Sequence, residues 1–490
     1  MKRQTRDVIV VGVVALLVRI PAFFAPQSLG FDDGQFAMSV IAMRHGGLPF
    51  KQVFSSQGPL FLPIAWLGDL LSFQRLDSPR TASVVSGVAL AILVLLIARR
   101  LTNPGAALLA AVMVALSGSI LWTTGPLTSD GIGAALTAGT VLAALRYWES
   151  PNVRRAIVVG LVAGLALAVK SLLVIPGLIA AGIWMVLRRR PRHLVVVPLV
   201  AVATLFVASA PWGISRVYDQ YVRYHTDAVA NRPIAANASK LVRTLFERDA
   251  PLLAVAATAL LAALGAMAAR RHAPRTAPDA SSATQAPAFP VVIWFFATLG
   301  VVLTESPMWR NHVAHVAVPL AILAGIALTS SRVRAVAVVV ALLFAPWSIV
   351  HLGELLRPQP ATGRTAQLEH RLHALPAGAL VISDTPGLVW RAGRRVPDRF
   401  VDVSILRITS PTASLRLTGA DIVRSAGRRD VCAVVRWSGQ RFTHFPRLGA
   451  QLQAIGYQPT LEHPHSPEVL WIKTGCDPVD RTSAAAGHDR

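Results

Sequence analysis

Residues 81–100 read TASVVSGVALAILVLLIARR, an apolar run that ends in two arginines. A helix needs about 20 consecutive, mostly apolar residues to cross the hydrocarbon core of a bilayer, and this run reaches that length. The run contains no acidic residue, and its only charges lie at one end. The segment therefore predicts a transmembrane helix whose arginines lie at the membrane surface.

The composition of the whole chain agrees with a membrane protein. Of the 490 residues, 53% are hydrophobic and 15% are charged, and the mean hydropathy is +0.51. A soluble protein typically has about a quarter of its residues charged. The formal net charge of +23 is compatible with nucleic-acid binding. However, the arginines fall in short clusters between apolar runs, which is the positive-inside pattern, so no nucleic-acid partner is expected.

Apolar runs of this kind recur through the first 352 residues, with basic clusters on every second loop. The pattern predicts about eleven transmembrane helices and a cytoplasmic N-terminus. A cleaved signal peptide is the alternative for the first run, but that run is long for one and lacks a convincing small-residue cleavage site. The predicted helices cover residues 8–25, 81–98, 104–122, 128–145, 156–169, 172–187, 194–211, 251–269, 289–304, 312–329 and 333–351.

The remainder of the chain has the composition of a soluble domain, and an odd number of spans places it on the extracytoplasmic side. Short apolar runs alternate with segments of helical spacing, which predicts a small α/β domain. The predicted division is a transmembrane domain at 1–352, an extracytoplasmic α/β domain at 353–476 and a disordered tail at 477–490. Strands are expected at 379–383, 430–435 and 468–473, helices at 365–375 and 445–455, and a flexible linker at 272–288.

Cys432 and Cys476 are the two cysteines of the chain, and both lie in the domain predicted outside. An even pair in an oxidising compartment indicates one disulfide, with two unpaired thiols as the alternative. The sequence has no Cys-x-x-Cys or His–Cys spacing typical of a structural zinc site. It also has no Walker A or GxGxxG motif, so nucleotide-driven chemistry has no support.

Two adjacent acids follow the first predicted helix, within residues 31–36, FDDGQF. Acids are costly inside a bilayer, so Asp32 and Asp33 at the mouth of a spanning helix are functional candidates. A solvated turn is the alternative, because Asp-Asp-Gly is also ordinary turn chemistry. Arg19 is expected to extend from the end of the first helix to the lipid headgroups. The amphipathic piece at 35–44 is expected either to pack internally or to lie flat on the membrane.

The order of these motifs resembles the GT-C membrane glycosyltransferases. The likeness is greatest to the branch that holds the protein O-mannosyltransferases and the transferases that add aminoarabinose to lipid A. Arg19 and the acidic motif at 31–36 resemble the arginine and the acids of the first outer loop in that branch. Gln57, in QGPLF, resembles the proline-rich turn that opens a juxtamembrane helix. A C-terminal α/β domain also fits some members.

Three further residues match later motifs of the same branch. Asp130, in LTSD, is similar to the acid at the start of the fourth span. Lys170 ends GLVAGLALAVK, which resembles a Gly-Leu-Ala…Lys segment, and His312 opens a segment similar to a His/Tyr-containing one. Relatives often carry a basic residue where this chain has Gln57, so another cation must contact the donor phosphate here. The candidates in the predicted outer loops are Arg216, Arg223, Arg232, Lys240 and Arg310.

The resemblance implies a hexosyl- or pentosyltransferase that works on the extracytoplasmic face of a bacterial inner membrane. The donor would be a polyprenyl-phosphate sugar, and the acceptor a lipid, a glycan or a protein. A carboxylate can take the acceptor's proton, and we assign this role to Asp32 with Asp33 assisting, although the reverse assignment stays open. The growing charge on the lipid phosphate needs a cation.

Two of the remaining site candidates carry alternatives. Asp130 is the second acid of the site, with packing or helix capping as its alternative. Lys170 is a candidate for donor binding, although anchoring a helix end is the stronger expectation. The sequence identifies no cofactor with certainty and does not reveal whether a metal is required; a divalent cation, if one is used, would be held by Asp32, Asp33 and Asp130.

Other classes of protein stay open at this point. A transporter or flippase of lipid-linked glycans also has many spans, but it should place charges near the middle of the membrane, where this sequence has few. A polymerase or ligase of lipid-linked glycans differs only in its acceptor. A membrane scaffold would tolerate replacement of the outer-loop acids without effect.

Overall fold

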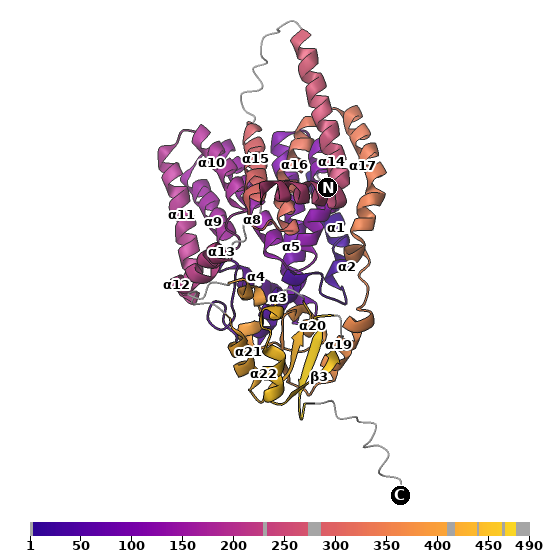
Figure 1. Ribbon diagram of the computed structural model, residues 1–490. Coiled ribbons are helices and arrows are strands. Elements are labelled where there is room, and N and C mark those ends of the chain that lie inside the picture. The colour runs from indigo at the N-terminus through magenta and orange to yellow at the C-terminus, as the bar shows by residue number, and fades with distance from the viewer. Residues whose placement is uncertain are drawn as a thin grey trace.

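The computed structural model describes residues 3–228, 233–272, 286–408, 417–438, 441–462 and 466–476. The predicted tail at 477–490 and most of the predicted linker at 272–288 lie outside these residues. Helices account for the chain up to residue 351, and a smaller part with a sheet lies at one end of them (Figure 1). The predicted fold class, mainly helical with a C-terminal α/β part, is confirmed.

Each of the eleven apolar runs contains a helix. The first run is divided into two helices and the third run is also divided, because the chain bends within each. The bounds are α1 (Arg3–Leu17), α2 (Ile20–Phe23), α5 (Thr81–Leu101), α6 (Pro104–Leu116), α7 (Gly118–Thr124), α8 (Ser129–Glu149), α9 (Val153–Leu167), α10 (Ile175–Leu187), α11 (Pro191–Ser209), α14 (Ile234–His272), α15 (Phe289–Thr304), α16 (Val313–Ala327) and α17 (Ser331–His351).

Fewer helices are suited to cross a bilayer alone than the sequence predicts. Within the described residues, five helices are long and apolar enough, and a sixth span results if the bent pair α6 and α7 counts as one. α9, α10 and α15 have 15, 13 and 16 residues. At the rise of an α-helix these extend only about 20 to 24 Å, less than the hydrocarbon core. Length and composition thus support five or six spans, against about eleven predicted.

Arg19 does not extend to the lipid headgroups as predicted. Its side chain is fully buried, donating from Nε to Thr124 Oγ1 at 2.8 Å and from Nη1 to the carbonyl oxygen of Ala15 at 2.6 Å. Gly87 leaves the room, since a Cβ at that position would lie 2.2 Å from Arg19 Nε. The carbonyl oxygen of Ala115, at the end of α6, also accepts from Arg19 Nη1 at 3.3 Å. Protein groups thus bind this arginine in place of water, except at Nη2, which has no hydrogen-bond partner among the described residues.

Two helices lie between the first and second predicted spans, α3 (Phe31–Arg44) and α4 (Phe61–Leu71). α3 is buried over most of its length and packs against α20 (Pro386–Arg391) of the C-terminal part. The amphipathic piece at 35–44 therefore packs internally and does not lie flat on the membrane. The two helices approach closely, because a Cβ on Gly34 would lie 2.4 Å from Gly387 Cα.

The C-terminal part contains a four-stranded sheet of order β1-β2-β4-β3. β1 and β2 are parallel, and the other two pairs are antiparallel. The sequence did not indicate β3, because it is an exposed edge strand that contains Pro459. The strands are β1 (Leu380–Ser383), β2 (Val431–Arg436), β3 (Tyr457–Glu462) and β4 (Val469–Lys473). The helices are α18 (Gly353–Leu356), α19 (Gly363–Ala374), α20, α21 (Gly419–Ala426) and α22 (Leu448–Ala454).

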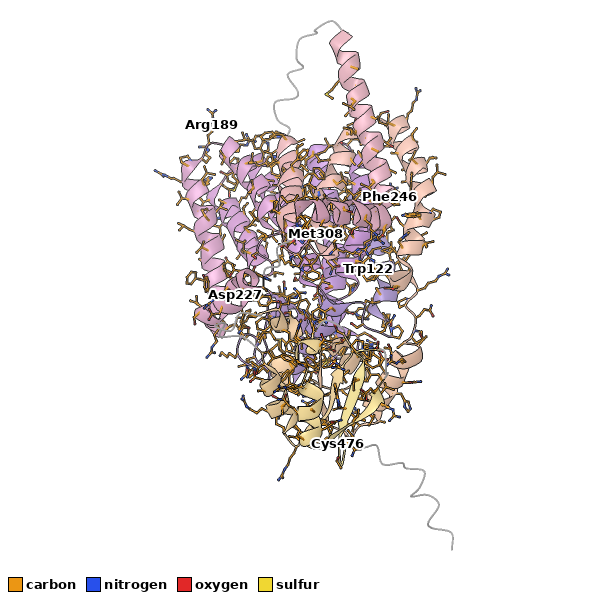
Figure 2. The ribbon with its side chains drawn as sticks, in the orientation of Figure 1. Trp122, Arg189, Asp227, Phe246, Met308 and Cys476 are labelled. Atoms are coloured by element: carbon orange, nitrogen blue, oxygen red, sulfur yellow. A yellow bond between two sulfur atoms is a disulfide. The ribbon has the colours of Figure 1, made fainter. Side chains whose placement is uncertain are left out.

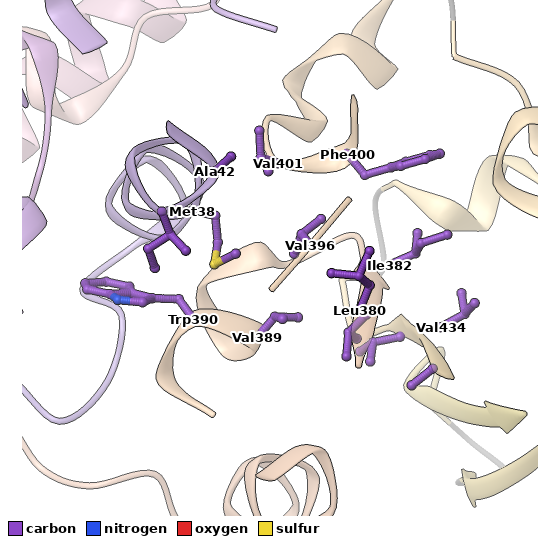
Figure 3. Close-up of a cluster of buried hydrophobic side chains, with 14 of the residues drawn as sticks. Met38, Ala42, Leu380, Ile382, Val389, Trp390, Val396, Phe400, Val401 and Val434 are labelled. Carbon is purple, nitrogen blue, oxygen red and sulfur yellow. The ribbon is translucent and has the colours of Figure 1, made fainter. Parts of the chain in front are cut away.

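One hydrophobic cluster joins the C-terminal part to the helical part. Met38 and Ala42 of α3 pack with Trp390 of α20, and the cluster continues to Ile382 and Val434 in the sheet (Figure 3). A disulfide connects Cys432 at the start of β2 to Cys476 after β4, with their Cα atoms 5.5 Å apart. The division of the chain at residues 352 and 353 stays a prediction, because this core crosses it.

Segments that the sequence predicts on opposite sides of the membrane lie at different ends of the molecule. Arg189, in one of the basic clusters predicted inside, lies at the end of the helices that is away from the sheet (Figure 2). Cys476 lies at the opposite end of the molecule. Helical segments predicted on the outer side, including Asp227, lie between these extremes and close to the C-terminal part.

Candidate active site

The acidic motif begins a helix, and its two carboxylates face different surroundings. Asp32 and Asp33 both lie in the first turn of α3, where acids interact favourably with the helix dipole. Asp33 is 1% exposed and Asp32 is partly exposed. Neighbouring residues on a helix point about 100° apart. Asp33 lines only the larger of the two cavities described below, whereas Asp32 lines both.

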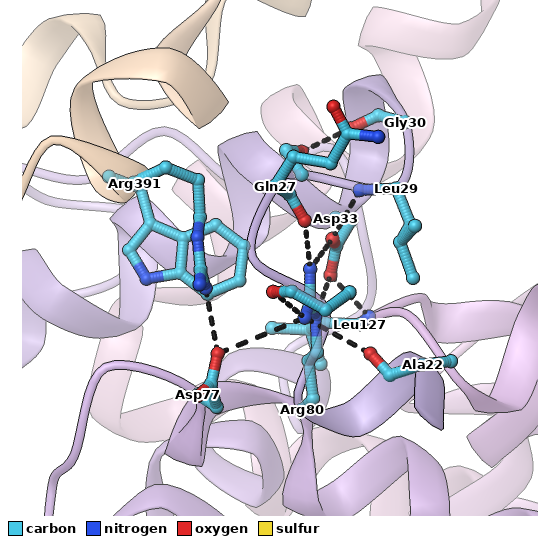
Figure 4. Close-up of polar contacts among 12 residues, drawn as sticks. Ala22, Gln27, Leu29, Gly30, Asp33, Asp77, Arg80, Leu127 and Arg391 are labelled. Atoms are coloured by element: carbon cyan, nitrogen blue, oxygen red, sulfur yellow. Dashed lines mark hydrogen bonds and ion pairs between the residues drawn. The ribbon is translucent and has the colours of Figure 1, made fainter. Parts of the chain in front are cut away.

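Asp33 is held by four hydrogen bonds (Figure 4). Arg80 donates from Nε to Oδ1 at 3.1 Å and from Nη2 to Oδ2 at 2.6 Å. The backbone amides of Leu29 and Leu127 donate to Oδ2 and Oδ1 at 2.9 and 2.8 Å. Both oxygens of Asp33 are therefore engaged, and the carboxylate ties α3 to the start of α5 and to the loop before α8.

Asp32 lies where two cavities meet. The inner cavity, of about 400 Å³, is lined by Gln57, Lys170, Tyr224 and His312 among others. The basic cavity, of about 730 Å³, is lined by Lys240, Arg248, Arg310 and Arg441 among others. Asp32, Trp309 and Arg407 line both. The lining groups come from helices far apart in sequence and from the C-terminal part.

Lys170, which lines the inner cavity, forms an ion pair with Asp130. Lys170 Nζ lies 3.1 Å from Asp130 Oδ1, which is also 3.4 Å from His315 Nε2 and 4.0 Å from His312 Nε2. Asp130 is in the first turn of α8, and Thr128, the N-cap residue of that helix, makes no capping hydrogen bond with its side chain. His312 also pairs through Nδ1 with Glu305. Three of the predicted site residues are thus brought together.

Gln57 lies close to Ser129 and Lys170 because the turn that carries it is hydrogen-bonded to the residues that follow α9. The amides of Gly58 and Leu60 donate to the carbonyl oxygens of Val169 and Ala168 at 3.1 and 2.9 Å. A Cβ on Gly58 would lie 2.2 Å from the Ala168 oxygen, so the approach needs glycine. Gln57 Oε1 accepts from Ser129 Oγ at 2.7 Å, and Ser129 Oγ also accepts from Lys170 Nζ at 3.3 Å.

The C-terminal part supplies groups that the sequence analysis did not single out. Arg407 is exposed, with its guanidinium 4.4 Å from the centre of the Trp309 ring. Three residues earlier, Ser404 accepts a hydrogen bond at its carbonyl oxygen from Tyr224 Oη at 3.0 Å. Asp402 is buried and bonded to Ser404, and burial raises its pKa to about 6. The segment around 402–407 therefore forms one wall of the inner cavity.

The surroundings of Asp32 raise the pKa of its carboxyl. Burial is the largest cause, and the negative charge of Asp130 adds to it. Lys170, Arg407 and His312 oppose the shift but do not outweigh it. A carboxylate with a raised pKa is a stronger base, so this position is suited to accept a proton.

The basic cavity holds an excess of cations. Arg248 is 8% exposed and stacks on Trp122, and its Nη1 finds no hydrogen-bond partner within the described part of the chain. Arg310 pairs with Glu247, and Lys240 donates to the carbonyl oxygen of Met308 at 2.7 Å. A buried guanidinium with an unused donor favours an anionic occupant.

Two predicted phosphate contacts lie away from both cavities. Arg216 is exposed and lines neither of them. Arg223 is also exposed and is near Asp219 and Asp227, at 4.0 and 3.6 Å. Arg232 lies outside the described residues. The short helices at 214–227 turn these arginines outward while Tyr221 and Tyr224 face inward.

The three acids suggested for a divalent cation do not form a ligand set. Asp33 gives both oxygens to Arg80 and backbone amides, and Asp130 faces Lys170 and His315. Over the ranges that the structure describes, no group of three or more His, Cys, Asp or Glu side chains could hold a metal ion.

Part of the sequence matches a known protein family. Residues 56–214 match the family model described as dolichyl-phosphate-mannose-protein mannosyltransferase. No curated protein matches the sequence significantly. The matched segment includes Gln57, Asp130 and Lys170, and it ends before the C-terminal part.

Solved structures are similar over nearly the whole chain. ArnT from Cupriavidus metallidurans, bound to undecaprenyl phosphate, is 15% identical with a TM-score of 0.63, over 95% of this chain and 97% of ArnT. Its apo structure gives a TM-score of 0.64 at 14% identity, over 95% and 98%. The oligosaccharyltransferase AglB from Archaeoglobus fulgidus, in complex with an inhibitory peptide and a dolichol-phosphate, gives 0.53 at 12% identity, over 98% and 75%. The chain therefore has the fold of the GT-C membrane glycosyltransferases, as its sequence motifs indicate.

Proposed function

We propose that this protein is a membrane glycosyltransferase that transfers a sugar from a polyprenyl-phosphate donor to a hydroxyl group of an acceptor. The observation that carries the proposal is the position of Asp32. Its carboxylate, with a raised pKa, lies where the inner cavity meets the basic cavity, and Lys170 and Arg407 both act on it electrostatically. The undecaprenyl phosphate in ArnT and the dolichol-phosphate in AglB support a lipid-phosphate donor.

The reaction needs a base at the acceptor hydroxyl and cations at the leaving group. In the proposed step, Asp32 takes the proton of the acceptor hydroxyl. At the same time, the oxygen of that hydroxyl forms a bond to the anomeric carbon of the sugar. The bond from that carbon to the phosphate oxygen breaks, and its electron pair leaves with the polyprenyl phosphate. Asp33 cannot share this role, because its oxygens are already engaged; it positions Asp32 by fixing the start of α3.

The phosphate has candidate partners on both sides of Asp32. In the inner cavity, Lys170 supplies the positive charge that relatives often carry at the position of Gln57, and Ser129 links the two side chains. In the basic cavity, Arg248 and Arg310 are available to the phosphate oxygens. Cations that are fixed before the reaction stabilise the charge of the leaving group without reorganising. Arg216 and Arg223 are not among the proposed phosphate contacts, because their side chains point outward, away from both cavities.

In this proposal, the donor reaches the site from the outer leaflet of a bacterial inner membrane. The segments predicted outside, those carrying Asp32, Asp130 and Glu305, gather around one cavity next to the C-terminal part. This agreement supports an extracytoplasmic site, where nucleotide sugars are absent and a lipid carries the sugar. The type of sugar and the acceptor, whether lipid, glycan or protein, are the finer points of the proposal.

An assay with purified protein tests transfer against transport. The protein is placed in nanodiscs, which have no enclosed compartment, with a radiolabelled polyprenyl-phosphate sugar and an extract of cell-envelope acceptors. We expect label to move to an acceptor with release of polyprenyl phosphate. The Asp32→Asn variant, with Asp227→Asn as a matched exposed control, should abolish the release while the control keeps it. Release that is equal in all three proteins would overturn the assignment of Asp32, and movement of the donor across liposomes without release would favour a flippase.

A further inference from the structure

A third cavity lies on the other side of the aromatic pair Phe54 and Tyr224. It has a volume of about 730 Å³, within the range of small-molecule sites. α3, the loop at 51–54 and the C-terminal segments at 395–405 and 425–430 line it. We call it the junction cavity, because both the helical part and the C-terminal part contribute to it.

The junction cavity is separate from the proposed active site. Phe54 lines the junction cavity and Tyr224 lines the inner cavity. Their rings are 5.3 Å apart, and both side chains are buried. Along α3 the first residue that lines the junction cavity is Met38, six positions after Asp32, which is about 9 Å along the helix axis. A ligand in the junction cavity would therefore not lie against Asp32.

The charges around the junction cavity are unequal. Four cations and two acids line it: Lys51, Arg395, Arg399 and Arg428 against Asp398 and Asp430. Arg428 is neutralised by Asp430, with Nη2 to Oδ2 at 2.6 Å, and Arg399 lies 3.7 Å from Asp421. Across the part of the chain that the structure describes, the side chains of Lys51 and Arg395 form neither a hydrogen bond nor an ion pair within 4.0 Å. Arg395 acts on Asp398 and Asp430 only from a longer distance, where its charge acts to lower the pKa of both acids. Two cations are thus left without a close partner in one hollow.

The excess of positive charge also affects the neighbouring His45. Burial lowers the pKa of His45, and Arg395 and Arg44 lower it further, while Asp398 opposes them. A cluster of cations that disfavours one more positive charge is suited to an anion. The floor beside it is apolar, with Ile41, Val396 and Phe400, so the hollow also accepts a nonpolar face of its ligand.

We propose that the junction cavity is a second binding site, for a polar molecule that carries phosphate or carboxylate, held by Lys51 and Arg395. This site does not depend on the proposed transfer reaction, because neither residue is part of that machinery. Phosphate in this hollow can come from a soluble sugar phosphate or from the headgroup of an anionic lipid. The test must separate these two sources.

Binding is measured with the full-length protein and four variants, Lys51→Gln, Arg395→Gln, the double variant of these two changes, and Arg395→Lys. Arg371→Gln, an exposed arginine of α19 that lines none of the cavities described here, is the control. In one arm the protein, in neutral detergent, is titrated with inorganic pyrophosphate and glucose 1-phosphate. In the other arm it is placed in nanodiscs of phosphatidylcholine with or without phosphatidylglycerol. The readouts are the unfolding temperature and hydrogen exchange at 45–54 and 395–400.

We expect at least one arm to raise the unfolding temperature and to slow exchange in those two segments. The double variant should bind at least tenfold more weakly, while Arg371→Gln binds as the wild type does and Arg395→Lys keeps most of the affinity. Without any anion the variants should be as stable as the wild type or more so, because they remove unpaired like charges. Binding that is the same in the wild type and the double variant, or no effect in either arm at millimolar anion, would overturn the proposal.

Discussion

The carboxylate of Asp33 and the guanidinium of Arg80 form a buried ion pair with two hydrogen bonds, of 2.6 and 3.1 Å. Neither side chain is exposed by more than 1%. Arg80 also donates to the carbonyl oxygens of Ala22, Phe23, Ala25 and Gln27, which end the first helical segment. The pair therefore fixes the segment that leads into α3, whose first turn carries Asp32.

Removing one partner of this pair should destabilise the fold. Asp33→Asn leaves Arg80 buried with only the more distant Asp77, at 3.9 Å, as a countercharge. Removing one partner of a buried pair typically costs about 3–5 kcal/mol. We expect Asp33→Asn and Arg80→Gln to lower the unfolding temperature in detergent by similar amounts. The double variant should be less destabilised than the sum of the two, because each single change leaves a charge or an amide unpaired. Additive losses would show that the two side chains act independently.

Asp32→Asn should have the opposite effect: it should lower turnover and leave the stability of the fold nearly unchanged. Asp32 is partly exposed and not held by an ion pair, so its replacement should change stability by no more than about 0.5 kcal/mol. If Asp32 is the base, turnover should fall by about two orders of magnitude or more, with donor binding retained. Steady-state kinetics and donor binding on the same preparation check this. An Asp33→Asn enzyme that folds normally but is equally inactive would restore the reverse assignment of the two acids.

The pH dependence of the reaction should report the raised pKa of Asp32. The base works only when it is deprotonated, so activity should fall as the pH drops through a pKa above the usual value of about 4. Arg407 lowers the pKa of Asp32, and therefore Arg407→Gln should move this acid limb to higher pH. Asp130 raises that pKa, so Asp130→Asn should move the limb to lower pH. Profiles of kcat/KM against pH measure both directions. A limb that does not move in either variant would assign it to another group.

Gly34 should tolerate no side chain. A Cβ at this position would lie 2.4 Å from Gly387 Cα and 2.7 Å from Gly387 N, so α20 would have to move off α3. Such overpacking costs about 1–3 kcal/mol or more. Gly34→Ala should lower the unfolding temperature and the turnover together. Gly182→Ala is the matched control, because a Cβ there meets no atom within 4 Å and alanine suits the middle of a helix.

The topology can be tested independently of the chemistry. The positive-inside pattern places Arg189 in the cytoplasm and the C-terminal part outside, and these lie at opposite ends of the molecule. Single cysteines introduced at Arg189 and at Arg371, in a background where Cys432 and Cys476 are serine, should react with a membrane-impermeant reagent in whole cells only at residue 371. Labelling of both positions, or only of residue 189, would contradict the orientation.

The sequence by itself determined the class of the protein and the locations of most of its helices. Apolar runs of nearly 20 residues form helices because a bilayer leaves the backbone no other hydrogen-bond partners. The strands β1, β2 and β4 follow from short apolar runs, and the candidate residues Asp32, Gln57, Asp130 and Lys170 follow from motifs. These are local properties, which a stretch of ten or twenty residues carries wherever the chain places it.

Only the tertiary structure decided which of two adjacent carboxylates is engaged. Asp32 and Asp33 are equivalent in the sequence, and the difference arises because Arg80, 47 residues away, reaches one of them. Arg19 is another example: its burial depends on Thr124, which a local pattern cannot reveal. No motif in the sequence distinguishes Arg407 and Arg248 from the many other arginines of the chain. Contacts of this kind depend on how distant segments approach, and a single sequence does not encode that approach in any local pattern.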